Sequence, residues 1–433
     1  MNKINLDDID QSAKTVLEGL HENGYDAYIV GGAVRDLLLG RKPKDFDIVT
    51  NATNSQIAGI FEECELIGRR FPIALIHFKG HYVEVSTFAS EFSDQELNEK
   101  ELRVKGRDRI PGTIEEDSAR RDFTINALFY DIKNGNILDF ENGLSDLKDG
   151  LLKMIGDPEL KTKEDPVRIL RGYRQLFQMN LTLDEETSKA FENNSQAVDS
   201  CSVSRLREEI NKIFKSTVCH LIFPKLISLG IFEKSLPEFF KFMENEFSID
   251  SKFNLLAVLI KVDDLILKYK KIREPILYIS LLLPYLSREF SDLWIKRPEY
   301  QEMRLFNEKI SEMWIELSVK KWVKRKITDM LWSQSRLLQV KEKMPRALVV
   351  YKEYFLDSFR FLRFKSELEG IYEAEVIFWS TIRHYSHIIK PVWESYSKGE
   401  VLTKDEILFF NKKLKSHKKS KPSYYKKNKK KSH

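Results

Sequence analysis

The stretch "GGAVRDLLLGRKPKDFDIVT", residues 31–50, decides the fold of the N-terminal part of this chain. It follows the strand-like run "AYIV" and contains a Gly31-Gly32 turn, a short helix, and a second strand that carries Asp45 and Asp47. Side chains two residues apart on a strand share a face, so the two aspartates point the same way. The stretch therefore predicts a strand, turn, helix and strand that present two carboxylates together.

Two carboxylates this close repel each other and raise one pKa unless a cation lies between them. Mg²⁺ suits such oxygen ligands. The following runs "PIALIHF" and "YVEVSTF" predict a hairpin that turns at Lys79-Gly80, with Glu84 on the face away from the core. A neighbouring strand would bring Glu84 beside Asp45 and Asp47, and three carboxylates can hold two metal ions that activate a hydroxyl and stabilise a leaving pyrophosphate. The alternative is that the aspartates are ordinary exposed acids on an edge strand.

The glycine pair follows a strand and opens a helix. Gly31 and Gly32 allow a close approach of the backbone, and N–H groups at a helix start can bind a phosphate. Arg35, one turn further on, adds positive charge to the same place. Most glycine pairs are plain turns, but this pair precedes a strand with two aspartates. The combination favours transfer of a nucleotidyl group from a triphosphate.

Strand patterns fade after about residue 150, where a long series of helical patterns begins. We expect an α+β protein with a mixed-sheet head and a large helical neck and body. The predicted parts are the head at 1–150, the helical neck at 151–235, the helical body at 236–410 and a disordered lysine-rich tail at 411–433.

The positive charge of the chain is concentrated in that tail. The net charge is +5, and the stretch from Lys412 to Lys431 contains eleven lysines and no acid, which leaves −6 for the rest of the chain. Such a run cannot bury enough apolar surface to fold. It is either a solubilising tail or a tether to phosphate backbones, with Tyr424 and Tyr425 available to stack on bases.

Other patterns limit the class of protein. The N-terminus "MNKINLDDID" has no signal-peptide pattern, and the longest apolar run, at 275–286, is too short to cross a bilayer. The three cysteines are too few and too scattered for a disulfide framework or a zinc site. We therefore expect a cytoplasmic protein that does not bind a membrane.

Two further motifs carry a resemblance to a known family. "EEDSARRDFTINALFYD" at 115–131 and "EDPVRILRGYR" at 164–174 follow the stretch at 31–50 in order. Together they resemble the nucleotidyltransferases that include bacterial poly(A) polymerases and bacterial-type CCA-adding enzymes.

The resemblance covers roughly residues 25–230 and has implications for single residues. It implies that Asp45 and Asp47 bind Mg²⁺ and that Gly31, Gly32 and Arg35 bind the triphosphate. It implies that Arg121 and Asp122 handle the sugar and phosphates, with Asp122 among the catalytic residues.

The third motif corresponds to the element that reads the base. Pro166 suits the first position of a helix, which makes Asp165 the N-cap, and Arg168, Arg171 and Arg174 follow at steps of three. As structure alone, these residues are a cap and a solvated face. As function, a carboxylate beside a guanidinium matches the edges of adenine and cytosine, and guanine or uracil would leave charged groups unpaired. The site should admit ATP or CTP.

Three features favour a poly(A) polymerase over a CCA-adding enzyme. "LIGRRFPIALIHF" at 66–78 resembles the arginine-rich form of poly(A) polymerases, "GTIEEDSARRDFTINALFY" is closer to that branch, and the basic tail suits diverse RNA ends. Two departures are the short segment "KGRDRIPGT" and Gly172, where alanine is typical. CCA addition stays the alternative. A non-catalytic RNA-binding protein is a distant third, because all three acids are present.

We therefore expect Mg²⁺-dependent, template-independent addition of AMP from ATP to RNA 3′ ends, with two metal ions and release of pyrophosphate. The expected partners are RNA 3′ ends and ATP. A monomer is expected, with RNA-decay proteins as candidate partners.

Overall fold

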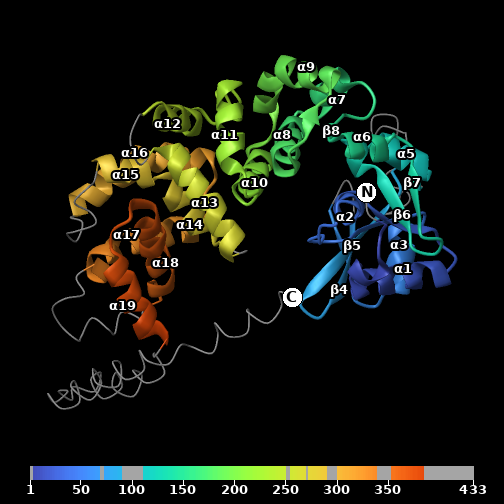
Figure 1. Cartoon of the computed structure of the whole chain (residues 1–433), viewed down its shortest axis with the longest axis horizontal. Coiled ribbons are helices and arrows are strands. Elements are labelled where there is room, and N and C mark those ends of the chain that lie inside the picture. Colours follow the sequence, from blue (N-terminus) through green and yellow to red (C-terminus); the bar gives the residue numbers. More distant parts are fainter. Residues whose placement is uncertain are drawn as a thin grey trace, which may run out of the picture. The chain divides into compact units, whose positions relative to one another are not determined.

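The structure, a computed structural model, describes residues 3–68, 73–89, 111–249, 254–269, 272–289, 300–338 and 353–384. The chain divides into two compact units, Met1–Phe240 and Lys241–His433 (Figure 1). The lysine-rich tail, most of "KGRDRIPGT" and both arginines of "LIGRRFPIALIHF" lie outside the described residues.

The first unit begins with a sheet of seven strands, drawn in blue to cyan in Figure 1. Its strands are β1 (Ala27–Val30), β2 (Asp47–Thr50), β3 (Cys64–Ile67), β4 (Ile73–Phe78), β5 (His81–Thr87), β6 (Leu128–Asp131) and β7 (Asn136–Asp139). Their spatial order is β3-β4-β5-β2-β1-β6-β7. Strands β2 and β5 are parallel and the other neighbours are antiparallel, which confirms the mixed sheet.

Local patterns explain the sheet's central hairpin. In β5, Val83 and Val85 are buried and Glu84 between them is half-buried, as the alternation of the sequence predicts. Strand β4 returns into β5 through Lys79-Gly80, and Gly80 has φ +92°, a conformation that favours glycine in a two-residue turn. The predicted hairpin is confirmed.

Helices and 3₁₀ turns connect and cover these strands. Helix α1 buries Ala13, Val16, Leu17 and Leu20 and packs on β1, β2 and β5, while α2 packs on β1 and β6. The elements of this region are η1 (Leu6–Asp8), α1 (Gln11–Glu22), α2 (Gly32–Leu38), α3 (Asn54–Ile60), α5 (Ile114–Ala119), η2 (Thr124–Asn126) and α6 (Gly143–Asp149).

The rest of the first unit is mainly helical and is built around α8 (Val167–Met179), which packs on α7, α10 and α11. Its other helices are α7 (Pro158–Glu164), α9 (Glu185–Asn193), η3 (Ser195–Ser200), α10 (Val203–Phe214), α11 (Cys219–Ser228) and α12 (Pro237–Ser248), which crosses into the second unit. One detail corrects the all-helical expectation. Strands β8 (Leu151–Leu152) and β9 (Thr182–Leu183) form a short parallel pair, because the chain extends at both ends of the α7–α8 segment.

In the described part of the second unit all regular elements are helices. They are α13 (Leu255–Tyr269), α14 (Glu274–Leu281), α15 (Leu283–Glu289), α16 (Tyr300–Glu316), α17 (Lys321–Leu338), α18 (Phe355–Glu369) and α19 (Glu373–His384). Helix α17 packs against α14, α18 and α19. Within the described ranges no helix has both the length and the apolar composition that crossing a bilayer requires.

Candidate active site

The predicted acids meet on the sheet where β2 runs beside β5. Asp47 is the direct partner of Glu84 in the parallel register of these strands. The sequence predicts that Asp45 lies on the same strand as Asp47. Strand β2 begins at Asp47, however, so Asp45 lies just before the strand. The half-buried Phe46 follows it, and the buried Ile48 follows Asp47. The register therefore brings together two acids that are distant in the sequence.

Burial and neighbouring acidic charges raise the pKa of Asp47 and of Glu84. Desolvation, together with the charges of Asp45 and Glu84, raises the pKa of Asp47 to about 6, although Arg121 acts in the opposite direction. Desolvation and the charge of Asp45 raise the pKa of Glu84, and Lys212 opposes this shift. The three acids therefore lie within electrostatic reach of one another. Lys212 belongs to α10, so the helical region also contributes to the field at the sheet.

Such a group has the chemistry that a divalent cation requires. Hard oxygen ligands suit Mg²⁺, and a nearby cation would stabilise the ionised form of each acid. Within the described residues, however, no three His, Cys, Asp or Glu side chains stand close enough together to hold a metal ion as they are placed here. Asp45, Asp47 and Glu84 fit a cation by charge, and their binding of Mg²⁺ stays a prediction.

Gly31 links β1 to α2 in a conformation that favours glycine. Its φ is +74°, and its N–H donates to the carbonyl of Leu128 over 3.1 Å. A Cβ here would lie 3.5 Å from the carbonyl oxygen of Asn126 and 3.6 Å from Nη1 of Arg121. Because the Gly31 amide is engaged in the sheet, we assign this residue a conformational role. Gly32, the first residue of α2, stays the predicted phosphate contact of the pair.

Arg35 lies in a polar network between the sheet region and α8. Its Nη1 donates to Oδ1 of Asn126 over 2.7 Å and to Oε1 of Gln175 over 3.4 Å, and Nη2 pairs with Asp36 over 2.8 Å. The Arg35 side chain is only 14% exposed. These contacts hold the guanidinium in one place near the start of α2.

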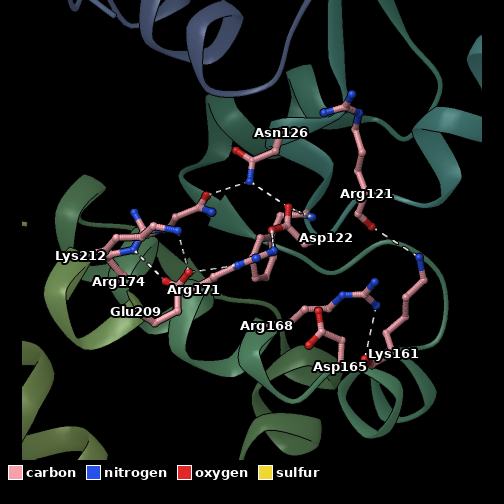
Figure 2. Close-up of polar contacts among 12 residues, drawn as sticks. Arg121, Asp122, Asn126, Lys161, Asp165, Arg168, Arg171, Arg174, Glu209 and Lys212 are labelled. Atoms are coloured by element: carbon pink, nitrogen blue, oxygen red, sulfur yellow. Dashed lines mark hydrogen bonds and ion pairs between the residues drawn. The ribbon is translucent and has the colours of Figure 1, made fainter. Parts of the chain in front are cut away.

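Asn126 is the centre of this network. Its Nδ2 donates to Oδ1 of Asp122 over 3.1 Å and to Oε1 of Gln175 over 3.0 Å, as Figure 2 shows for Asp122. Gln175 is a buried residue of α8. An asparagine can accept from an arginine while it donates to a carboxylate, so it joins the two charged groups. The network connects Arg35, Asp122 and α8.

Arg121 and Asp122 are neighbours in sequence but have different partners. Arg121 donates from Nε and Nη2 to Oδ2 of the buried Asp117 over 3.0 and 2.8 Å, and it lies over the ring of Phe129. Asp122 lies 4.0 Å from Nη1 of Arg171. The two side chains thus point in different directions, as Figure 2 shows.

The arginines of α8 are partly buried and do not form a solvated face. Glu209 of α10, only 2% exposed, lies 3.5 Å from Nε of Arg171 and 3.7 Å from Nε of Arg174 (Figure 2). Lys212 donates to the same carboxylate over 3.0 Å. Desolvation lowers the pKa of Arg174, and the charge of Glu209 opposes this shift. One buried carboxylate therefore holds three cations.

Asp165 and Arg168 are placed differently from the expectation. The sequence predicts that Asp165 is the N-cap of the helix, but α8 has no side-chain cap, and Asp165 accepts two hydrogen bonds from Nη2 of Arg205 over 2.8 and 3.0 Å. A residue before proline disfavours the helical conformation, so the chain leaves the helix at Asp165 and α7 is separated from α8. The Asp165 carboxylate then pairs with Arg205 and does not cap α8. Arg168 donates from Nη1 to the carbonyl of Lys161 over 3.3 Å.

Known proteins are similar to this part of the chain. Residues 27–153 match the family model "Poly A polymerase head domain", and residues 180–243 match the model "Probable RNA and SrmB- binding site of polymerase A". Poly(A) polymerase I of Salmonella typhimurium is 39% identical over 239 residues, which cover 54% of this chain and 51% of that protein. This matched part of the chain, residues 27–243, belongs to the poly(A) polymerase and CCA-adding nucleotidyltransferase family.

Other members of the family are similar over the same part. Poly(A) polymerase I of Haemophilus influenzae is 40% identical over 53% of this chain and 52% of that protein. The CCA-adding enzyme of Bacillus pumilus is 36% identical over 51% of this chain and 53% of that protein. The chain spans about half the length of these curated relatives.

The fold is also found in solved structures. The Bacillus stearothermophilus CCA-adding enzyme in complex with CTP aligns with 95% of this chain and 99% of its own, with a TM-score of 0.53 and 20% identity. At this identity the likeness concerns the fold.

Three polar residues of the candidate site are not predicted by the sequence: Asn126, Gln175 and Glu209. Asn126 lies inside the motif "RRDFTINAL", but the pattern gives it no role of its own. The sequence does indicate that Glu209 is buried, because it lies on the same helical face as the buried Leu206 and Ile210. A charged residue on an apolar face must find a partner, since an unpaired buried charge is costly. The sequence does not say which partner it finds.

Proposed function

We propose that this protein is a Mg²⁺-dependent, template-independent RNA 3′-adenylyltransferase, that is, a poly(A) polymerase. The observation that carries the proposal is the pairing of Asp47 with Glu84 across β2 and β5, with Asp45 in electrostatic reach. A metal bound there would supply charge to activate the RNA 3′-hydroxyl and to neutralise the pyrophosphate that leaves.

The chain's own residues would position the substrates. Gly32 and Arg35 would face the triphosphate at the start of α2, with Gly31 shaping the turn. Arg121 and Asp122 would lie at the sugar and phosphates. The network of Asn126 orders this side of the site, because it joins Arg35 to Asp122. Pre-ordered groups cost less to arrange when the substrate binds.

The base would be read by Asp165 and by Arg168 of α8. A carboxylate acceptor beside a guanidinium donor accepts adenine or cytosine and leaves charges unpaired against guanine or uracil. In the structure Asp165 is paired with Arg205, so nucleotide binding would exchange or share this partner. Arg171 and Arg174 are held by the buried Glu209, which favours a supporting role for them over direct contact with the base.

Two observations support ATP as the single substrate. The curated relatives named poly(A) polymerase I are 38–40% identical to this chain, and those named CCA-adding enzyme are 34–36% identical. The lysine-rich tail suits an enzyme that meets many RNA ends, because it attracts phosphates without regard to sequence. CCA addition is the second candidate function, because the fold is also that of a CCA-adding enzyme.

The experiment measures incorporation of each labelled nucleotide onto two acceptors, an unstructured oligonucleotide that ends in A and a tRNA lacking its last three nucleotides. Long extension of the oligonucleotide with ATP alone is expected, and Asp47→Ala should abolish it while RNA binding persists. Three additions restricted to the tRNA and dependent on CTP would establish CCA addition instead. Full activity of Asp47→Ala would overturn the catalytic role of the acids.

A further inference from the structure

A cluster of positive charge lies in the second unit, where α16 passes into α17. The sequence "VKKWVKRK", residues 319–326, contains five cations and no acid. The segment lies outside both regions matched by family models. We call the following residues the α17 basic patch (Figure 1, helix α17): Lys320, Lys321, Trp322, Lys324 and Arg325.

Packing holds the patch in a defined place. Leu317, Val319 and Val323 are buried, at 1%, 6% and 0% exposure, so the chain is anchored before and inside the first turn of α17. The N–H of Val319 donates to the carbonyl of Trp314 over 3.0 Å, and Ser318 has φ +46°, which together close the end of α16. The side chains between these anchors must therefore point outward.

The stability of the helix does not explain this composition. The N-terminal end of a helix carries a partial positive charge, so cations in the first turn of α17 are unfavourable. Lys321 and Arg325 are four residues apart and repel each other. The charge of Arg325 is offset in part by Asp329 and Glu353, whereas Lys320, Lys321 and Lys324 have no acidic partner among the described residues. A local arrangement that costs stability is typical of a functional site.

The patch also has no ion pairs within the part of the chain that the structure describes. Lys320, Lys321, Lys324 and Arg325 make none there, whereas the adjacent Lys326 pairs with Glu353 over 2.8 Å. Trp322 is 45% exposed and has no ring or cation–π partner among the described residues. Trp322 and Arg325 are three residues apart on α17, so their side chains are neighbours on its surface.

We propose that the α17 basic patch binds single-stranded RNA, with Trp322 stacked on a base and Lys321, Lys324 and Arg325 at the phosphates. A flat aromatic ring beside cations matches a polymer that alternates bases with phosphates. An acidic protein would use the cations but would not need the ring. The inference rests on the proposed function, which makes RNA the substrate, and it adds a contact for RNA in the second unit.

The test measures equilibrium binding of a fluorescent unstructured oligonucleotide by anisotropy at several salt concentrations, with the full chain and without ATP. Trp322→Ala should weaken binding about tenfold, and Trp322→Phe should retain most of the affinity because a phenyl ring still stacks. Lys321→Glu combined with Arg325→Glu should lower the salt slope by about 0.7 for each phosphate that the protein no longer neutralises. Ile315→Ala, which truncates a side chain that is 70% exposed on the neighbouring α16, is the control and should bind as the parent does.

Two outcomes would overturn the proposal. Unchanged affinity in Trp322→Ala, together with an unchanged salt slope in the charge-reversed variant, would show that the patch does not bind RNA. If only the charges matter, and poly-glutamate displaces RNA at equal charge, the patch is a surface for an acidic protein. RNA binding is measured without catalysis, so the binding result does not depend on enzyme activity. A parent protein that incorporates no nucleotide would contradict the proposed function, but the binding of RNA by the α17 basic patch could still be judged.

Discussion

Asp47 and Glu84 are directly paired acids on the parallel strands β2 and β5. Desolvation, the charge of Asp45 and the charge of Glu84 raise the pKa of Asp47. A pKa of about 6 for Asp47 means that the folded protein binds this proton more tightly than the unfolded chain does. The contribution of Asp47 to the free energy of unfolding is therefore fully present at low pH and is lost as the pH rises through 6.

Asp47→Asn should for this reason stabilise the protein at neutral pH in the absence of divalent cations. The expected gain in unfolding free energy at pH 7.5 is on the order of 1 kcal/mol, reduced from the full linkage value because solvent screens an exposed carboxylate. The gain should shrink as the pH is lowered towards 4 and when Mg²⁺ is added. Thermal unfolding measures it, with Glu62→Gln, an exposed acid outside the site, as the control. Equal stability of Asp47→Asn and the parent would argue against repulsion among the acids.

Helix α8 organises the site at the level of secondary structure. One of its faces carries Arg171 and Arg174 towards Glu209, and Gln175 reaches the network of Asn126. Another side of α8 packs on Phe191 of α9. A Cβ at Gly172 would lie 2.4 Å from the ring of Phe191, which is fully buried. The glycine is therefore a packing requirement in this chain.

Gly172→Ala should destabilise the protein although alanine favours helices. The Phe191 ring must move in a filled core, which typically costs about 1–3 kcal/mol and exceeds the roughly 1 kcal/mol that alanine returns in a helix. Gly59→Ala is the matched control, because nothing lies within 4 Å of its added Cβ in α3, and it should stabilise slightly. Chemical denaturation of the three proteins gives the comparison. A more stable Gly172→Ala would mean that Phe191 yields easily.

At the scale of the whole molecule, RNA contacts are proposed in several separate parts of the chain. The acids and α8 lie in the first unit, the α17 basic patch lies in the second, and the lysine-rich tail is outside the described residues. Separate basic segments on one chain raise the total affinity for a polymer when they bind it together. Each segment should then add its own share to the salt dependence of binding.

Deleting residues 412–433 should weaken RNA binding and flatten its dependence on salt, because eleven lysines are removed. A Gly/Ser segment of equal length in place of the tail controls for chain length. Anisotropy with an unstructured oligonucleotide across a salt series is the measurement. If the salt slope does not change, the tail acts on solubility and not on RNA.

The sequence by itself determined the elements that local patterns control. The mixed sheet, the hairpin at Lys79-Gly80, the helical region after about residue 150 and the family motifs follow from alternation, helical spacing and turn residues near one another in the chain. Only the tertiary structure decided the partners. Glu209 pairs with the arginines of α8. Asp165 pairs with Arg205 and is not the predicted helix cap. Asn126 connects Arg35 with Asp122. The physical reason is that a buried charge pairs with whatever the packing of distant helices brings within reach, and no local pattern records that distance.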